Sequence, residues 1–118
     1  MTAQILWLLI THWVGDFVFQ THWQAVNKSK NLEALIGHVL IYMLTLLVGV
    51  GLILPVPQAL VFMMVNGLLH FFTDYCTSKW SAMLWQKGDV HNFFVVVGLD
   101  QLIHQITLIL TFWVIVYQ

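Results

Sequence analysis

Three apolar segments of the sequence each carry a histidine and an aspartate four residues apart. The pairs are His12 with Asp16, His70 with Asp74 and, in reverse order, Asp100 with His104. Residues four apart on a helix share one face, so each segment would present its pair on a single stripe. Ionisable side chains are costly in a transmembrane segment and usually mark a functional site. The pattern therefore predicts a metal or proton site built inside a helix bundle.

The composition is that of a membrane protein. The chain has 118 residues, of which 60% are hydrophobic and 8% charged, whereas a soluble domain carries about 25% charged residues. The mean hydropathy is +0.86. We therefore expect an integral membrane protein with a single domain over residues 1–118. The sequence has no arginine and one cysteine, Cys76, which argues against nucleic-acid binding and excludes a multi-cysteine zinc motif.

The apolar segments predict an all-α fold, an integral membrane bundle of four transmembrane helices. Each segment is near or above the roughly 20 residues needed to cross a bilayer. The expected helices cover residues 2–23, 34–54, 58–77 and 90–118. Between the third and fourth, residues 78–89 are amphipathic and predict a short interfacial helix that ends at Gly88.

All four lysines lie in loops that this topology places on one side of the membrane. Lys28 and Lys30 are in the first loop, and Lys79 and Lys87 are in the third. The termini and the proline turn at residues 55–57 lie on the other side and carry no lysine. By the positive-inside rule, we expect the lysine-bearing loops in the cytoplasm and both termini in the periplasm.

All four expected helices place a ligand-type side chain in the cytoplasmic half. At a rise of about 1.5 Å per residue, Asp16 lies roughly 10 Å below the lysine-side surface and Asp100 lies about 15 Å below it. The second helix contributes His38, and the outer half of the bundle is apolar. The seven candidate metal ligands are His12, Asp16, His38, His70, Asp74, Asp100 and His104.

Imidazole and carboxylate ligands together suit transition metals such as Zn, Mn, Fe or Ni. A cation would also relieve the repulsion between three buried carboxylates. The expected cofactor is a divalent metal, Zn or Mn, present as one ion or as two ions bridged by carboxylates. Two bridged ions can clamp the attacking and leaving oxygens in phosphoester hydrolysis.

Other polar residues lie next to the candidate ligands and could bind a substrate. Gln20 is one turn beyond Asp16, Gln101 adjoins Asp100, and Lys79 is the lysine nearest to the level of Asp74. The glutamines could instead make interhelical hydrogen bonds, and Lys79 could extend to the membrane surface.

At these motifs the chain resembles the DUF3307 family of small membrane proteins from bacteria and their phages. The resemblance covers essentially the whole chain. It rests on His12-x-x-x-Asp16-Phe-x-x-Gln20, the Lys28 and Lys30 loop, His38, His70-x-x-x-Asp74-Tyr followed by Lys79, and Asp100-Gln101-x-x-His104. The family is similar to inner-membrane proteins described as metal-dependent hydrolases. The resemblance therefore implies a bacterial inner-membrane hydrolase that uses a metal, and it indicates no substrate.

Three functions remain open. The first is a metal-dependent hydrolase acting on a lipid or phosphoester at the cytoplasmic leaflet, with His38, Asp16 and Asp74 as catalytic residues. The second is a transporter or channel for divalent cations or protons, although the apolar outer half offers no polar path unless a homo-oligomer supplies one. The third is a non-catalytic membrane module that binds a partner membrane protein.

Overall fold

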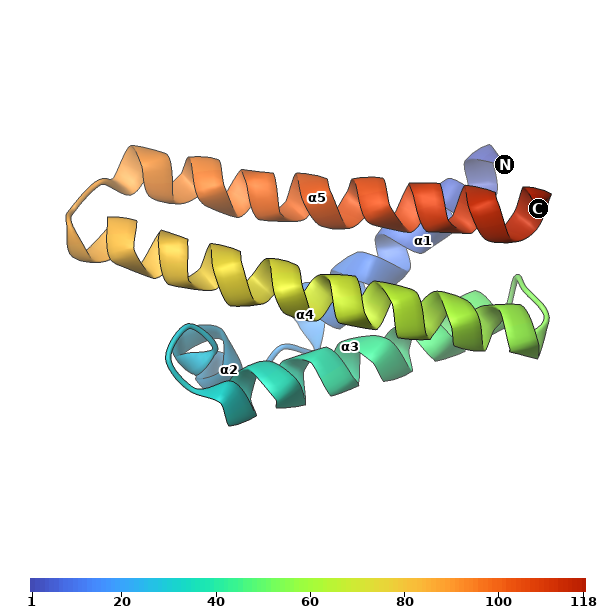
Figure 1. The fold of residues 1–118 in the computed structure, drawn as a ribbon, viewed down its shortest axis with the longest axis horizontal. Helices are drawn as coiled ribbons and strands as arrows, with labels where there is room; N and C mark the ends of the chain where they lie inside the picture. Colours follow the sequence, from blue (N-terminus) through green and yellow to red (C-terminus); the bar gives the residue numbers. More distant parts are fainter.

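The computed structural model describes all 118 residues and consists of helices that run along one long axis (Figure 1). The elements are α1 (Thr2–Trp13), a π-helical turn η1 (Val14–Val18), α2 (His22–Asn27), α3 (Leu32–Gly51), α4 (Val56–Gln86) and α5 (Val90–Tyr117). Both termini and the α3–α4 turn lie at one end, whereas α2 and the α4–α5 turn lie at the other (Figure 1). We call the second end the lysine end, because Lys28, Lys30 and Lys87 lie at its turns and Lys79 lies in the last part of α4.

Three helices, and not four, are long and apolar enough to cross a membrane: α3 with 20 residues, α4 with 31 and α5 with 28. The prediction of a spanning helix over residues 2–23 is wrong. The α1 helix has 12 residues and η1 has 5, so together they extend about 25 Å at 1.5 Å per residue. This length is short of the roughly 30 Å of a bilayer core.

The first apolar segment breaks because a new helix begins at Thr21. The Thr21 hydroxyl accepts a hydrogen bond from the Gln24 backbone N–H at 3.1 Å, and the Gln24 side chain accepts one from the Thr21 N–H at 3.0 Å. This reciprocal capping box satisfies two N–H groups that the start of a helix leaves unpaired. The residues after Thr21 therefore belong to the short helix α2, whose first two residues were predicted in the first spanning helix and whose other four were predicted in the loop.

The predicted break between the third helix and an interfacial helix over residues 78–89 is also wrong. Helix α4 runs without interruption to Gln86, since residues 78–86 contain neither proline nor glycine to end it. The chain turns only at Gly88, which has a φ of +75°, as expected for a glycine after a helix. Helix α5 then begins at Asp89, where hydrogen bonds from Asn92 cap the helix and lower the pKa of the Asp89 carboxyl.

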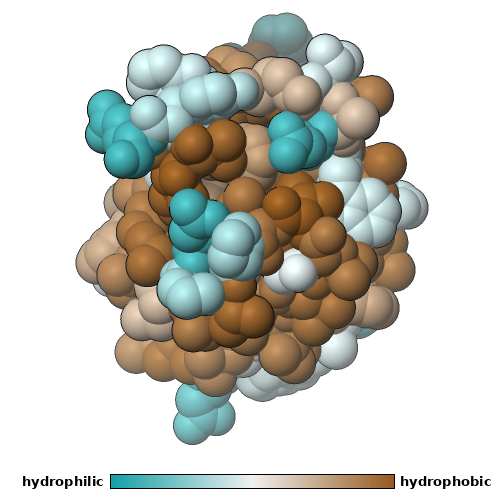
Figure 2. All heavy atoms as spheres, turned by 90° about the vertical axis from the view of Figure 1, so that its right-hand side faces the viewer, coloured by the Kyte–Doolittle hydropathy of each residue, from teal (hydrophilic) through white to brown (hydrophobic).

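The apolar core fills the part of the bundle near the termini. Its nine buried residues are Leu8, Tyr42, Leu46, Val50, Leu54, Ala59, Phe62, Leu108 and Phe112. The outward faces of the helices are also apolar; Leu44 is 62% exposed and Phe72 is 62% exposed. Figure 2, which faces the end that carries the termini, shows a mainly hydrophobic surface with scattered hydrophilic residues. So much exposed apolar area is typical of a surface that contacts lipid or protein.

Helix α1 packs closely on α3 at Gly49. The Trp7 indole N–H donates a hydrogen bond to the Gly49 carbonyl at 2.7 Å, and a Cβ at Gly49 would overlap the side chain of Thr11. We expect Gly49→Ala to destabilise the fold by about 1–3 kcal/mol, the usual cost of overpacking, as measured by thermal unfolding in detergent. Gly51→Ala is the control, because a Cβ there meets nothing within 4 Å. Equal melting temperatures for the two variants would contradict this role of Gly49.

Candidate metal centre

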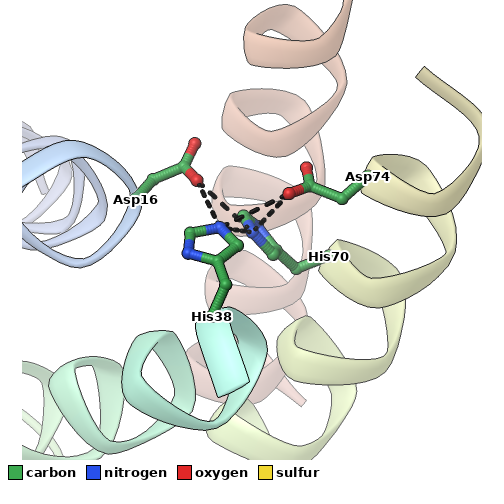
Figure 3. A group of neighbouring side chains, drawn as sticks. All are labelled: Asp16, His38, His70 and Asp74. Carbon is green, nitrogen blue, oxygen red and sulfur yellow. Dashed lines mark hydrogen bonds and ion pairs between the residues drawn. The ribbon is translucent and has the colours of Figure 1, made fainter. Parts of the chain in front are cut away.

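Four buried side chains from three helical elements meet at one point in the bundle (Figure 3). Asp16 comes from η1, His38 from α3, and His70 and Asp74 from α4. None of the four is more than 3% exposed, and one donor atom from each lies within 4.8 Å of the others. The pairing of His70 with Asp74 on one stripe of a helix is as predicted from their spacing.

The distances between these donor atoms suit a tetrahedral ion. The His38 Nε2 lies 3.0 Å from Asp16 Oδ1, 3.0 Å from His70 Nε2 and 3.3 Å from Asp74 Oδ2. The His70 Nε2 lies 3.4 Å from each of the same two carboxylate oxygens. Zinc bonds of about 2.0–2.1 Å place tetrahedral ligands about 3.3–3.4 Å apart. The four atoms therefore occupy positions close to those that a bound ion would require.

Hydrogen bonding among these four side chains cannot account for all the close approaches. The two Nε2 atoms and two carboxylate oxygens make five contacts of 3.4 Å or less. Each Nε2 carries at most one proton and an ionised carboxylate carries none, so with both aspartates ionised at most two of the five contacts can be hydrogen bonds. A cation at the centre would replace the missing donors.

A second group lies beside the first and shares Asp16 with it. Asp16, Asp100 and His104 each place a donor atom within 4.8 Å of the others. The His104 Nε2 lies 3.0 Å from Asp74 Oδ1 and 3.4 Å from Asp100 Oδ1. Asp74 thus directs Oδ2 at the first group and Oδ1 at the second. This is the arrangement expected of a carboxylate that bridges two ions.

Aromatic stacking holds the His70 ring in place. Its ring lies between those of Tyr42, at 4.0 Å, and His104, at 4.1 Å, each inclined by 19°. The Nδ1 atoms of His38 and His70 are buried without a hydrogen-bond partner. Metal-bound histidines usually donate this N–H to an acceptor. Here the packing of the rings, and not such an acceptor, orients His70.

His12 belongs to neither group, because both of its ring nitrogens are engaged elsewhere. Gln101 donates its amide N–H to Asp16 at 2.8 Å and to Asp100 at 3.1 Å. Its oxygen therefore accepts from His12 Nε2 at 2.9 Å, which leaves His12 Nδ1 to accept from the Tyr42 hydroxyl at 2.9 Å. This chain of hydrogen bonds holds the carboxylates of Asp16 and Asp100, so His12 supports the site without a free ligand atom.

Lys28 provides the positive charge closest to the centre. Its ammonium lies 2.9 Å from Asp74 Oδ2, and its side chain is 19% exposed. Burial alone would lower the pKa of Lys28, but the carboxylates of Asp74 and Asp16 outweigh it and raise the pKa above its usual value. The ammonium occupies the same carboxylate oxygen that a metal would use.

A cavity of about 640 Å³ leads from the lysine end to the two groups, and its inner wall includes Asp16, Asp100 and Gln101. Gln20 and Lys28 also line it. This volume lies within the roughly 300–1,000 Å³ of small-molecule sites. The centre is therefore buried in the bundle and still reachable from one side.

Six of the seven residues predicted as metal ligands lie in the two groups, and His12 lies beside them. The predicted substrate residues Gln20 and Gln101 line the cavity. Lys79 does not: its ammonium donates to the Ser29 carbonyl at 2.8 Å and lies 4.8 Å from the centre of the Tyr75 ring.

Sequence reasoning missed three residues that contact the centre: Lys28, Tyr42 and Thr77. Two of them carried a signal in their spacing. Tyr42 follows His38 by four residues and Thr77 follows Asp74 by three, so each shares a helix face with a candidate ligand. Thr77 donates its hydroxyl to Asp100. Lys28 is brought in by the position of α2, which no helical spacing indicates.

Comparison with known families gives one match. The model of a family described as "Protein of unknown function (DUF3307)" matches residues 5–118. The match includes every residue of both groups, and the description names no activity. No curated protein and no solved structure is significantly similar to the chain.

Proposed function

We propose that this chain, which belongs to the DUF3307 family, is a membrane-embedded metal-dependent hydrolase that acts on a lipid or phosphoester at the cytoplasmic leaflet. The observation that carries the proposal is the pair of adjacent ligand groups, which share Asp16 and which Asp74 contacts through its two different oxygens. The cavity supports it, because a purely structural ion would need no access from the surface. The positive-inside rule favours a cytoplasmic location for the lysine end.

The chain's own residues would divide the work at this centre. His38 and His70 would hold one ion and His104 and Asp100 a second, with Asp16 and Asp74 bridging them. Divalent ions at these positions would supply Lewis acidity and activate water. His38 is predicted both as a metal ligand and as a catalytic residue, and the position of its Nε2 among the other donor atoms favours the role of ligand. Gln101 would keep Asp16 and Asp100 in place through its two hydrogen bonds.

Transport of cations or protons is less well supported. Between the centre and the end with the termini, the bundle is filled by side chains such as Leu46, Phe62 and Leu108, each 1% exposed or less. A conducting path would need polar groups or water through this layer. The packing of the core therefore favours chemistry at the centre over passage through it.

Protein purified without chelator is expected to contain one or two divalent ions per chain, Zn or Mn, as measured by elemental analysis. Removing them with a chelator should abolish hydrolysis of a phospholipid substrate, and adding Zn or Mn back should restore it, because in the proposed function the ions activate the attacking water. If the wild type bound no metal even at saturating Zn or Mn, the hydrolase proposal would fail.

A further inference from the structure

Ser78 places an unused hydroxyl in the wall of the cavity. It lies on α4 four residues beyond Asp74, so it continues the stripe of His70 and Asp74 toward the lysine end. Ser78 is only 8% exposed, lines the cavity, and its Oγ has no hydrogen-bond partner. Buried hydroxyls are almost always paired, so an unpaired one calls for an explanation. A ligand in the cavity would supply the missing partner.

Gln20 repeats this feature in the same cavity. It follows Asp16 by four residues, lines the same cavity, and its Oε1 is buried without a partner. An amide can present either its oxygen or its N–H to a ligand. Two unpaired polar groups thus line the approach to the centre, one four residues after Asp16 and one four residues after Asp74. Lys28, also in the cavity wall, adds a positive charge.

Apolar side chains also line the cavity. On α5 they are Phe93, Phe94, Val96 and Val97, in the turns before Asp100, and Trp85 of α4 is another. Phe94 is 63% exposed and Trp85 is 58% exposed. The cavity therefore combines polar groups near the centre with apolar side chains that reach the outer surface, a combination that suits an amphiphilic molecule.

We infer that this cavity binds an anionic lipid by its phosphate, with Ser78 and Gln20 as hydrogen-bond partners, Lys28 as counter-charge, and the acyl chain along the apolar side chains of α5. The inference rests on the proposed metal centre, because a phosphate beside Asp16 and Asp100 would be repelled unless cations neutralise the carboxylates. In the hydrolysis of a terminal phosphate, the oxygen of water bonds to phosphorus and the phosphorus–oxygen bond to the lipid breaks. One proton of the water passes to the departing lipid oxygen.

A binding experiment distinguishes recognition of a whole lipid from recognition of its headgroup alone. Metal-loaded protein is titrated in detergent with phosphatidic acid, phosphatidylcholine or glycerol phosphate, and the bound fraction is measured by native mass spectrometry. We expect phosphatidic acid to bind at least 10-fold more tightly than the other two probes, since only it combines a terminal phosphate and a net negative headgroup with apolar chains. Equal affinity for phosphatidylcholine, whose phosphate is a diester balanced by choline, would overturn the preference for an anionic headgroup, and equal affinity for glycerol phosphate would overturn the requirement for a lipid.

Ser78→Ala is expected to weaken phosphatidic acid binding about 10- to 100-fold, as for loss of a hydrogen bond to a charged group. Its metal content should be unchanged and its melting temperature should not fall, because the Oγ has no partner to lose. Ser81→Ala is the matched control: Ser81 lines the same cavity, but its hydroxyl already donates to the Ser78 carbonyl at 3.1 Å. Unchanged affinity in Ser78→Ala would overturn the inferred contact.

If Ser78→Ala proves unstable, Ser78→Thr and Ser78→Val decide the question, because they have the same shape and only threonine keeps the hydroxyl. Tighter binding by the threonine variant supports the inference, and equal binding overturns it. Selective binding of phosphatidic acid without hydrolysis would contradict the hydrolase and support the inferred ligand. Hydrolysis of a neutral lipid ester, without selective binding of phosphatidic acid, would support the hydrolase and contradict the inferred ligand.

Discussion

Asp74→Asn is expected to lower metal affinity by at least about 100-fold and to abolish hydrolysis. The Asp74 carboxylate contacts His38, His70 and His104 at 3.0–3.4 Å, and asparagine keeps its shape but removes its charge. Replacing a group that only supports a ligand already costs about 10- to 100-fold, and Asp74 would be a ligand to both ions. Isothermal titration with Zn or Mn and a phosphate-release assay would measure the two losses.

Asp89→Asn is the control for this substitution. Asp89 caps α5 at the lysine end and lies outside both groups of ligand atoms, so metal content and activity should match the wild type. Should Asp74→Asn retain wild-type metal affinity, Asp74 would not be the bridge between the two groups. Retained affinity with lost activity would point to a role in the reaction alone.

Lys28→Met is expected to make the folded protein dependent on metal. In a metal-free protein the Lys28 ammonium is the cation that faces Asp74, and loss of one partner of a buried pair costs about 3 kcal/mol or more. The melting temperature in chelator should therefore fall. Saturating metal should recover most of the loss, because a ligand that binds only the folded state stabilises it.

The same variant should bind Zn or Mn about 10-fold more tightly, because the ammonium no longer competes for Asp74 Oδ2 or repels the ion. Thermal unfolding with and without chelator, together with a metal titration, measures both effects. Lys87→Met is the control, since Lys87 is exposed at the same end of the molecule. Equal stability of the two variants in chelator would mean that Lys28 does not neutralise the centre.

The ends of the long helices could be predicted where the sequence contains a proline or a glycine that ends a helix. Pro55 follows the end of α3 within a few residues of the expected position, and Gly88 follows the end of α4, where the interfacial helix was expected to end. The breaks that were misplaced follow weaker signals. The capping pair of Thr21 and Gln24 was visible in the sequence, but the apolar residues around it favoured one continuous helix. Amphipathic sequence after residue 77 suggested a new helix, although it contains no residue that ends one.

More of the site than of the fold could be predicted from the sequence, because spacing on a helix fixes which side chains share a face. His70 with Asp74 and Asp100 with His104 needed only a helix, and both helices form. What spacing cannot give is the contact between elements. The exclusion of His12 depends on Gln101 of another helix, and the arrival of Lys28 depends on how α2 folds back toward α4.

The broken first helix also bears on how a lipid would reach the centre. Helix α4 has 31 residues and α5 has 28, about 46 Å and 42 Å at 1.5 Å per residue, whereas α1 and η1 together reach only about 25 Å. An apolar stretch shorter than the hydrocarbon core creates a hydrophobic mismatch, which the bilayer relieves by thinning locally. In a membrane, the bilayer would thus be thinner beside η1, and the lipid headgroups there would lie closer to Asp16. The chain would shorten the distance that a headgroup must travel, by deforming the bilayer and not by extracting the lipid from it.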